Sequence, residues 1–99
     1  MKFGIQAVIK AAEGKGDELA SIMLQAANLL STMDGCILYL VQQSLTDDSK
    51  VLITEVWDNK ASHAMSLTND NVKALINQAK PIIVGMEHNP AKVIGSHGI

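Results

Sequence analysis

Apolar and polar residues alternate at the start of the chain, and this alternation predicts a strand over residues 2–10. Side chains two positions apart in a strand point to the same face, so the segment has one apolar face and one mixed face. Gln6 lies on the mixed face, in the middle of the segment. The apolar face comprises Phe3, Ile5, Ala7 and Ile9, and the mixed face comprises Gly4, Gln6, Val8 and Lys10.

After a glycine-containing turn at residues 13–16, the apolar residues recur at helical spacing, which predicts a helix over residues 17–32. Asp17 and Glu18 place negative charge at the positive end of the helix dipole. Gly35 follows the helix and can adopt the left-handed conformation that ends it. The apolar stripe comprises Leu19, Ile22, Met23, Ala26, Leu29, Leu30 and Met33.

Two more strands are expected over residues 36–43 and 51–57, and the polar turn between them predicts a hairpin. We then expect Asp58 to cap a short helix over residues 60–67. A second helical segment is expected to begin at the Asn69-Asp70 cap and to end at Pro81, and a last short strand to cover residues 91–96. One face of the 51–57 strand comprises Val51, Ile53, Glu55 and Trp57.

The resulting order, βαββαβ, predicts a ferredoxin-like α+β sandwich with a four-stranded antiparallel sheet, built as a single domain from residues 1–99. Helices can cover only one face of such a sheet. The first three strands nevertheless carry apolar residues on both faces, whereas a sheet with one solvated face normally alternates with polar residues. We therefore expect the second face to be buried in a two-fold homodimer.

Composition narrows the class of function. The chain has 99 residues, a net charge of −2 and eight lysines but no arginine, which argues against a nucleic-acid-binding protein. No apolar run is long enough to span a membrane, and the first residues do not resemble a signal peptide. The single cysteine, Cys36, cannot form an intrachain disulfide, which favours a cytoplasmic protein.

The sequence lacks the motifs that usually mark a phosphate, metal or cofactor site. The segment Gly14-Lys15-Gly16 opens a helix as a phosphate loop does, but the third glycine of the dinucleotide fingerprint is replaced by Leu19. The histidines His63, His88 and His97 are widely spaced, so the sequence predicts no metal site. The chain also has no recognisable flavin or nicotinamide motif, and we expect no cofactor.

The segment from Thr54 to His63 is the most informative. Glu55 and Trp57 end one face of a strand, and His63 follows six residues after Trp57, in the first turns of a helix between two small alanine neighbours. An imidazole directed into a cavity between helix and sheet could exchange protons near neutral pH. The alternative is structural: Trp57 in the core, His63 half exposed, and Glu55 paired with a lysine or exposed at an edge.

The string TEVWDNKASHAMSL resembles the signature of the antibiotic biosynthesis monooxygenase family, with matches at Glu55, Trp57, Ala61 and His63. The resemblance extends over most of the chain and includes the opening strand, the helix start at residues 16–19 and Gly35. It implies a dimeric α+β barrel, in which the sheets of two subunits pack face to face. Members of the family include cofactor-independent monooxygenases that oxidise hydroquinones and anthrones, quinol monooxygenases and haem-degrading enzymes.

The resemblance implies that His63 is the general acid or base and that Trp57 shapes the pocket and stacks on an aromatic substrate. Gln6 is expected to orient a substrate oxygen, or alternatively to form hydrogen bonds at the dimer face, and Glu55 to bind substrate as a pocket carboxylate. The haem-degrading pattern has an asparagine on the first strand, where this chain offers only Gln6. Two other functions stay open: a non-catalytic protein that binds an apolar small molecule, and an isomerase that uses His63 as a proton shuttle.

Overall fold

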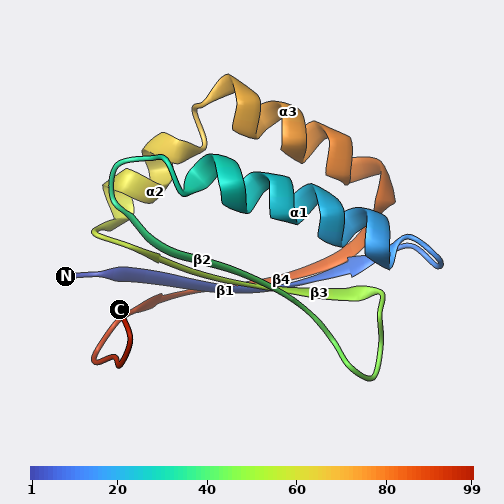
Figure 1. The fold of residues 1–99 in the computed structure, drawn as a ribbon, viewed down its shortest axis with the longest axis horizontal. Helices are drawn as coiled ribbons and strands as arrows, with labels where there is room; N and C mark the ends of the chain where they lie inside the picture. The colour runs from blue at the N-terminus through green and yellow to red at the C-terminus, as the bar shows by residue number, and fades with distance from the viewer.

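The structure is a computed structural model that describes all residues, 1–99, and it consists of one sheet covered on one face by helices (Figure 1). The helices lie together on one side of the sheet, and the other face of the sheet is uncovered. The elements are β1 (Phe3–Ala11), α1 (Gly16–Leu30), β2 (Cys36–Gln43), β3 (Lys50–Trp57), α2 (Lys60–Ser66), α3 (Asp70–Ala79), a 3-10 turn η1 (Lys80–Ile82) and β4 (Ile83–Lys92).

The sheet has four strands in the order β2-β3-β1-β4, and every neighbouring pair is antiparallel. This arrangement confirms the ferredoxin-like α+β fold that the sequence predicts. The hairpin of β2 and β3 is also as predicted, and β2 has the expected bounds. No helix is long and apolar enough to cross a membrane.

The register of β1 determines which side chains face the helices. Ile5, Ala7 and Ile9 are buried on the covered face, whereas Gln6 is exposed on the uncovered face. Gln6 is paired with Thr54 of β3 and Asn89 of β4, which also lie on the uncovered face. The strand alternation predicted from the sequence is therefore observed, and it separates Gln6 from the helices.

The core lies between the covered face and helices α1 and α3. Its larger cluster joins β1, α1, β3 and the end of α3, and the smaller one lies where α1 and β3 end. Trp57 belongs to the smaller cluster and is completely buried. The larger cluster comprises Ala7, Ile9, Ala11, Leu19, Ile22, Met23, Val51, Ile53 and Ala79, and the smaller comprises Leu30, Trp57 and Val72.

Two predicted details are wrong. The last strand runs from Ile83 to Lys92 rather than over residues 91–96, because pairing with the whole of β1 defines it. The cap of α2 is Asn59, whose side-chain oxygen accepts a hydrogen bond from the Ser62 backbone N–H at 2.8 Å. Asp58 instead donates its backbone N–H to the Gly35 carbonyl oxygen, which ties β3 to the loop before β2.

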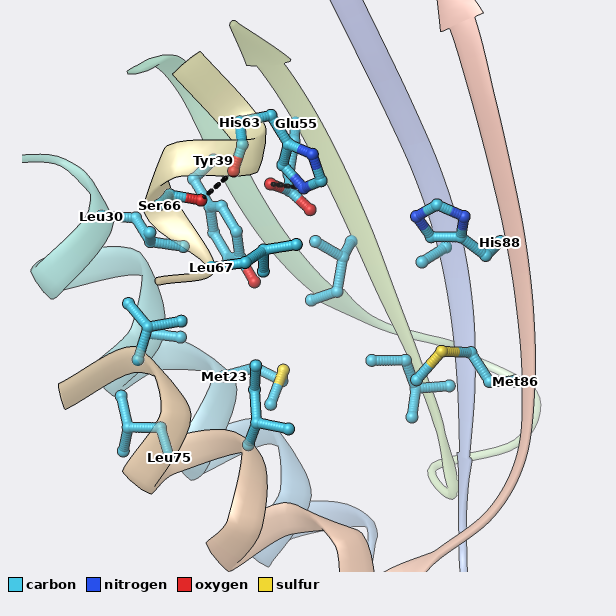
Figure 2. A pocket seen from close by; sticks show the side chains of 16 residues that line it. Met23, Leu30, Tyr39, Glu55, His63, Ser66, Leu67, Leu75, Met86 and His88 are labelled. Atoms are coloured by element: carbon cyan, nitrogen blue, oxygen red, sulfur yellow. Dashed lines mark hydrogen bonds and ion pairs between the residues drawn. The ribbon is translucent and has the colours of Figure 1, made fainter. Parts of the chain in front are cut away.

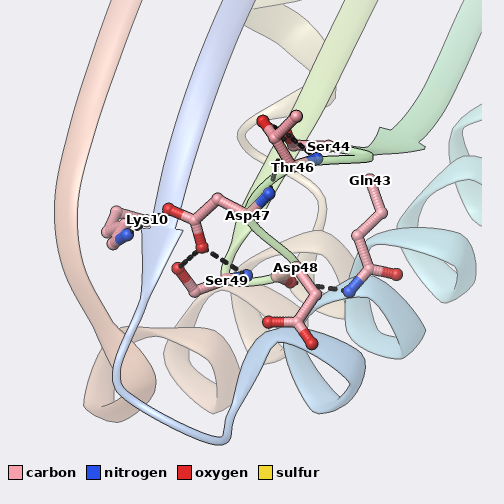
Figure 3. A network of polar contacts seen from close by, with 7 residues as sticks. All are labelled: Lys10, Gln43, Ser44, Thr46, Asp47, Asp48 and Ser49. Atoms are coloured by element: carbon pink, nitrogen blue, oxygen red, sulfur yellow. Dashed lines mark hydrogen bonds and ion pairs between the residues drawn. The ribbon is translucent and has the colours of Figure 1, made fainter.

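The turn between β2 and β3 is fixed by a network of polar side chains centred on Asp47 (Figure 3). The Asp47 carboxylate accepts hydrogen bonds from the Ser49 hydroxyl and backbone N–H and forms an ion pair with Lys10 of β1. These contacts hold the pKa of Asp47 well below its usual range. Gln43 donates to the Asp48 carbonyl oxygen at 2.6 Å, which closes the end of the hairpin.

Candidate active site

A cavity of about 200 Å³ lies between the covered face of the sheet and the three helices. Sixteen residues line it and twelve are hydrophobic, so a ligand would leave water for a largely apolar environment. Figure 2 shows Glu55 and His63 side by side at one end, and Met23 and Leu75 at the other. The four residues of the lining outside this hydrophobic set are Glu55, His63, Ser66 and His88.

His63 is presented to the cavity by α2, the short helix that Asn59 caps. The imidazole lies near two aromatic rings: its centroid is 5.6 Å from that of Phe3 and 5.8 Å from that of Trp57. The backbone carbonyl oxygen of His63 accepts a hydrogen bond from the Ser66 hydroxyl at 2.6 Å. Only 15% of the His63 side chain is exposed, so its protonation state depends on the protein rather than on bulk water.

Glu55 projects from β3 beside this imidazole. Its Oε1 atom lies 3.9 Å from His63 Nε2 and accepts a hydrogen bond from Trp57 Nε1 at 3.0 Å. The buried indole N–H therefore has a partner, and the carboxylate is held in a fixed orientation. The separation of 3.9 Å is beyond a hydrogen bond, but contacts between acid–base groups in a site commonly tighten when a ligand is bound.

Burial lowers the pKa of His63, because the imidazolium loses hydration; Glu55 opposes this effect, and His88 reinforces it. The imidazole is therefore mainly neutral at pH 7 and can accept a proton. If it does so, the imidazolium forms next to the Glu55 carboxylate, which stabilises the new positive charge. This pair is suited to taking a proton from a bound molecule and keeping it in the site.

Tyr39 of β2 lines the same cavity, and Figure 2 shows its ring beside Ser66 and Leu67. Burial raises the pKa of the Tyr39 hydroxyl, and the negative charge of Glu55 raises it further. The hydroxyl therefore remains protonated and can donate a hydrogen bond to an oxygen of a ligand. Burial, with Glu55 second, also raises the pKa of the Cys36 thiol, which keeps it a poor nucleophile.

The structure brings His63 and Glu55 together at the cavity but separates the other two predicted site residues from it. Trp57 does not line the cavity; it lies behind the site and contacts it through Glu55 and His63. Gln6 is exposed on the uncovered face of the sheet. Of the three alternatives for Glu55, the structure shows a pocket carboxylate with a tryptophan partner.

Sequence reasoning did not single out Tyr39, Ser66 or His88 as site residues, although all three line the cavity. Tyr39 could have been found, because the register of the hairpin pairs it with Glu55. His88 could not, because it pairs with Ala7 in a strand that the sequence pattern misplaces. No three histidine, cysteine or acidic side chains lie close enough together to hold a metal ion.

The sequence model of the family described as antibiotic biosynthesis monooxygenase matches residues 2–78, well over half of the chain. The chain belongs to this family. The matched range contains both Glu55 and His63, which lie side by side in the cavity. Among curated proteins, nothing matches the chain.

Solved structures agree with this assignment. A protein from Chloroflexus aurantiacus assigned to the same family is 35% identical, with a TM-score of 0.91, and the alignment covers 100% of this chain and 99% of the other. A second such protein, from Deinococcus radiodurans, is 24% identical with a TM-score of 0.84, covering 100% and 98%. SnoaB from Streptomyces nogalater, described as a cofactor-independent oxygenase, shares the fold at 11% identity, with a TM-score of 0.85 and coverage of 99% and 98%.

Proposed function

We propose that this protein is a cofactor-independent monooxygenase that oxidises a quinol- or anthrone-like aromatic with O₂, with His63 as the base. The observation that carries the proposal is a half-buried, mainly neutral imidazole beside a carboxylate at the end of an apolar cavity. An electron-rich phenol becomes a strong reductant of O₂ once it is deprotonated. The protein then needs to supply a proton acceptor, an orientation and exclusion of water.

The size of the cavity supports an aromatic ligand. A closed apolar cavity of about 150 Å³ is known to accommodate benzene. The cavity beside His63 measures about 200 Å³ and is partly open, so it has room for a substituted ring, and a fused ring system would extend towards the opening. The Tyr39 hydroxyl and the His63 imidazole offer a donor and an acceptor for the oxygen of such a ring.

The proposed reaction balances without a cofactor. His63 removes the phenolic proton, and the phenolate transfers one electron to O₂, which gives superoxide and an organic radical. These two combine to form a carbon–oxygen bond, and the resulting peroxide takes the proton from the imidazolium. His63 then accepts the proton on the same carbon while the O–O bond breaks, and the departing hydroxide takes that proton from the imidazolium and leaves as water. For a ring CH₂ group, one oxygen atom becomes the carbonyl and the other becomes water.

The remaining site residues have supporting roles in this proposal. Glu55 stabilises the imidazolium while it holds the substrate proton, and Trp57 fixes Glu55 through its hydrogen bond. A stacking role for Trp57 would require its ring to reach the cavity, from which Glu55 and His63 separate it. The exposure of Gln6 on the uncovered face supports the dimer-face role over contact with substrate.

We further propose a homodimer in the cytoplasm, formed through the uncovered face of the sheet. That face carries apolar side chains from three strands, including Val8 of β1, Leu52 of β3 and Leu40 of β2, which is 42% exposed. Such a patch is unfavourable in water and favourable between two copies related by two-fold symmetry. Sedimentation at micromolar concentration should give twice 10.6 kDa, and a mass of one chain would refute the dimer.

The decisive experiment follows O₂ uptake by the purified protein with a panel of hydroquinones and anthrones. We expect uptake above the autoxidation blank, and a loss of about 100-fold or more in His63→Ala, since general base catalysis typically contributes 10²–10⁴-fold. The matched control is His97→Ala, because His97 lies in the exposed C-terminal segment. Tight binding with no uptake would favour a carrier, and proton exchange into the ligand without uptake would favour an isomerase.

A further inference from the structure

The cavity beside His63 continues into a second one. This second cavity measures about 300 Å³, and four of its seven lining residues also line the first. The two are therefore parts of one hollow that runs between α3 and the strands β1 and β4. The shared residues are Ile9, Met23, Ile76 and Met86, and the residues that belong to the extension alone are Ala79, Lys80 and Ile83.

The chemistry changes along this hollow. Glu55, His63 and His88 lie in the first part, whereas the extension is lined by aliphatic and thioether side chains except for Lys80, which is exposed. Figure 2 shows Met23 and Met86 on opposite sides of the hollow, away from His63 and Glu55. Thioether side chains are flexible and adapt to different shapes. The junction can therefore widen around a ligand that passes through it.

The rim of the extension also exposes apolar surface. Ile76 on α3 is 38% exposed and Met86 on β4 is 57% exposed, and both border the hollow. They lie on the helix side of the sheet, so the proposed dimer face does not involve them. A ligand that covers them removes this apolar surface from water, which favours binding.

We propose that the ligand of this site is an aromatic ring that carries an apolar alkyl substituent, with the ring beside His63 and the substituent in the extension. The ring and its position rest on the proposed function; the substituent rests on the extension alone. A polar or charged substituent is excluded from the aliphatic stretch of the lining, because burying it without a partner is unfavourable.

The test is calorimetric titration without O₂, so that binding is measured and no reaction follows. The ligands are methyl-, ethyl-, propyl- and butylhydroquinone. Each added methylene that enters the extension should tighten binding about fourfold, which corresponds to roughly 0.8 kcal/mol per buried CH₂. Affinity that does not depend on chain length overturns the proposal, and this comparison needs only the unmodified protein.

Two variants of Ile83 test whether the alkyl substituent occupies the extension. Ile83→Lys places a charged side chain in the extension, and Ile83→Thr places a hydroxyl there with less change in shape. Either should flatten the dependence of affinity on chain length. The matched control is Ile94→Lys, because Ile94 is 91% exposed and lines neither cavity. An unchanged dependence in folded Ile83 variants places the substituent elsewhere and overturns the proposal.

The test of the alkyl substituent and the test of the proposed function can fail independently of each other. Chain-length dependence without O₂ uptake in air supports the extension and refutes the oxygenase, whereas uptake without chain-length dependence does the opposite.

Discussion

Replacing Glu55 by glutamine removes one negative charge from beside His63 and leaves the shape of the side chain almost unchanged. The glutamine oxygen can still accept the hydrogen bond from Trp57 Nε1, so the buried indole keeps its partner. What is lost is the attraction between the carboxylate and the imidazolium that forms when His63 takes a proton. The substitution therefore isolates the electrostatic contribution of Glu55 from its structural one.

The distance between the groups gives the size of the effect. Two unit charges about 4 Å apart attract by about 1 kcal/mol in water and by about 4 kcal/mol at an effective dielectric constant near 20. Glu55 Oε1 and His63 Nε2 are 3.9 Å apart, and only 13% and 15% of their side chains are exposed. We therefore expect a loss of roughly 2–4 kcal/mol of imidazolium stabilisation, which lowers the rate about 30- to 900-fold.

The assay is the pH profile of O₂ uptake, together with an NMR titration of the His63 ring protons. The activity should decrease in acid as His63 becomes protonated, at a pH below 6.5 because its pKa is lowered from that value. Glu55 raises this pKa, so the Glu55→Gln variant should move the acid limb to still lower pH while the plateau rate falls.

A purely structural role for Glu55 would not move the rate and the acid limb in this way. The matched control is Glu13→Gln, since Glu13 is exposed in the turn between β1 and α1 and lines neither cavity. The same substitution there should change neither quantity. A Glu55→Gln variant with the plateau and the acid limb of the unmodified protein would refute the role assigned to the carboxylate.

Three other substitutions test the fold and the site. Trp57→Phe should lower the free energy of unfolding by about 2 kcal/mol, measured in urea, because the buried indole donates a hydrogen bond to the Glu55 carboxylate. Gly35→Ala should lower it by more than 1 kcal/mol, since Gly35 has φ +85° and an added Cβ would lie 2.5 Å from Ser62 Oγ. Asp47→Asn should weaken the dependence of the urea midpoint on pH below about 4, because the depressed pKa of Asp47 stabilises the fold only while this carboxylate is ionised.

The glycine and aspartate substitutions each have a matched control and a result that would contradict the reasoning. Gly95→Ala should change the free energy of unfolding by less than about 0.5 kcal/mol, since nothing lies within 4 Å of the added Cβ. Asp48→Asn, next to Asp47 in the turn, should leave the acid dependence unchanged. A Gly35→Ala variant as stable as Gly95→Ala, or equal acid sensitivity of both aspartate variants, would contradict the local geometry described above.

The sequence determined most of the architecture because most of the elements follow from local patterns. Alternation in β1 and β3, and helical spacing in α1, each depend only on residues that are close in the chain, so their faces could be assigned directly. The Asn69 cap of α3 is equally local, and the structure confirms it with hydrogen bonds from two backbone N–H groups. The signature around His63 was sufficient to indicate the family.

Strand β4 shows where local patterns fail. Its sequence contains Gly85 and Pro90 and has few β-branched residues, so it predicts a strand poorly. Proline is tolerated there because β4 is an edge strand, with one side free of partners. The strand forms because β1 offers a complete row of backbone groups to pair with. The residues of β1 that make β4 a strand therefore lie about eighty residues before it in the chain.

The site depends on the same kind of long-range information. The cavity combines side chains from β1, α1, β2, β3, α2, α3 and β4, and no pattern within one of these segments specifies where the others lie. The sequence by itself determined that His63 and Glu55 were candidates and that the sheet is apolar on both faces. Only the tertiary structure decided that Trp57 holds the carboxylate rather than lining the cavity, that Gln6 faces away from it, and that the cavity extends between α3 and β4, because each depends on how separate elements pack.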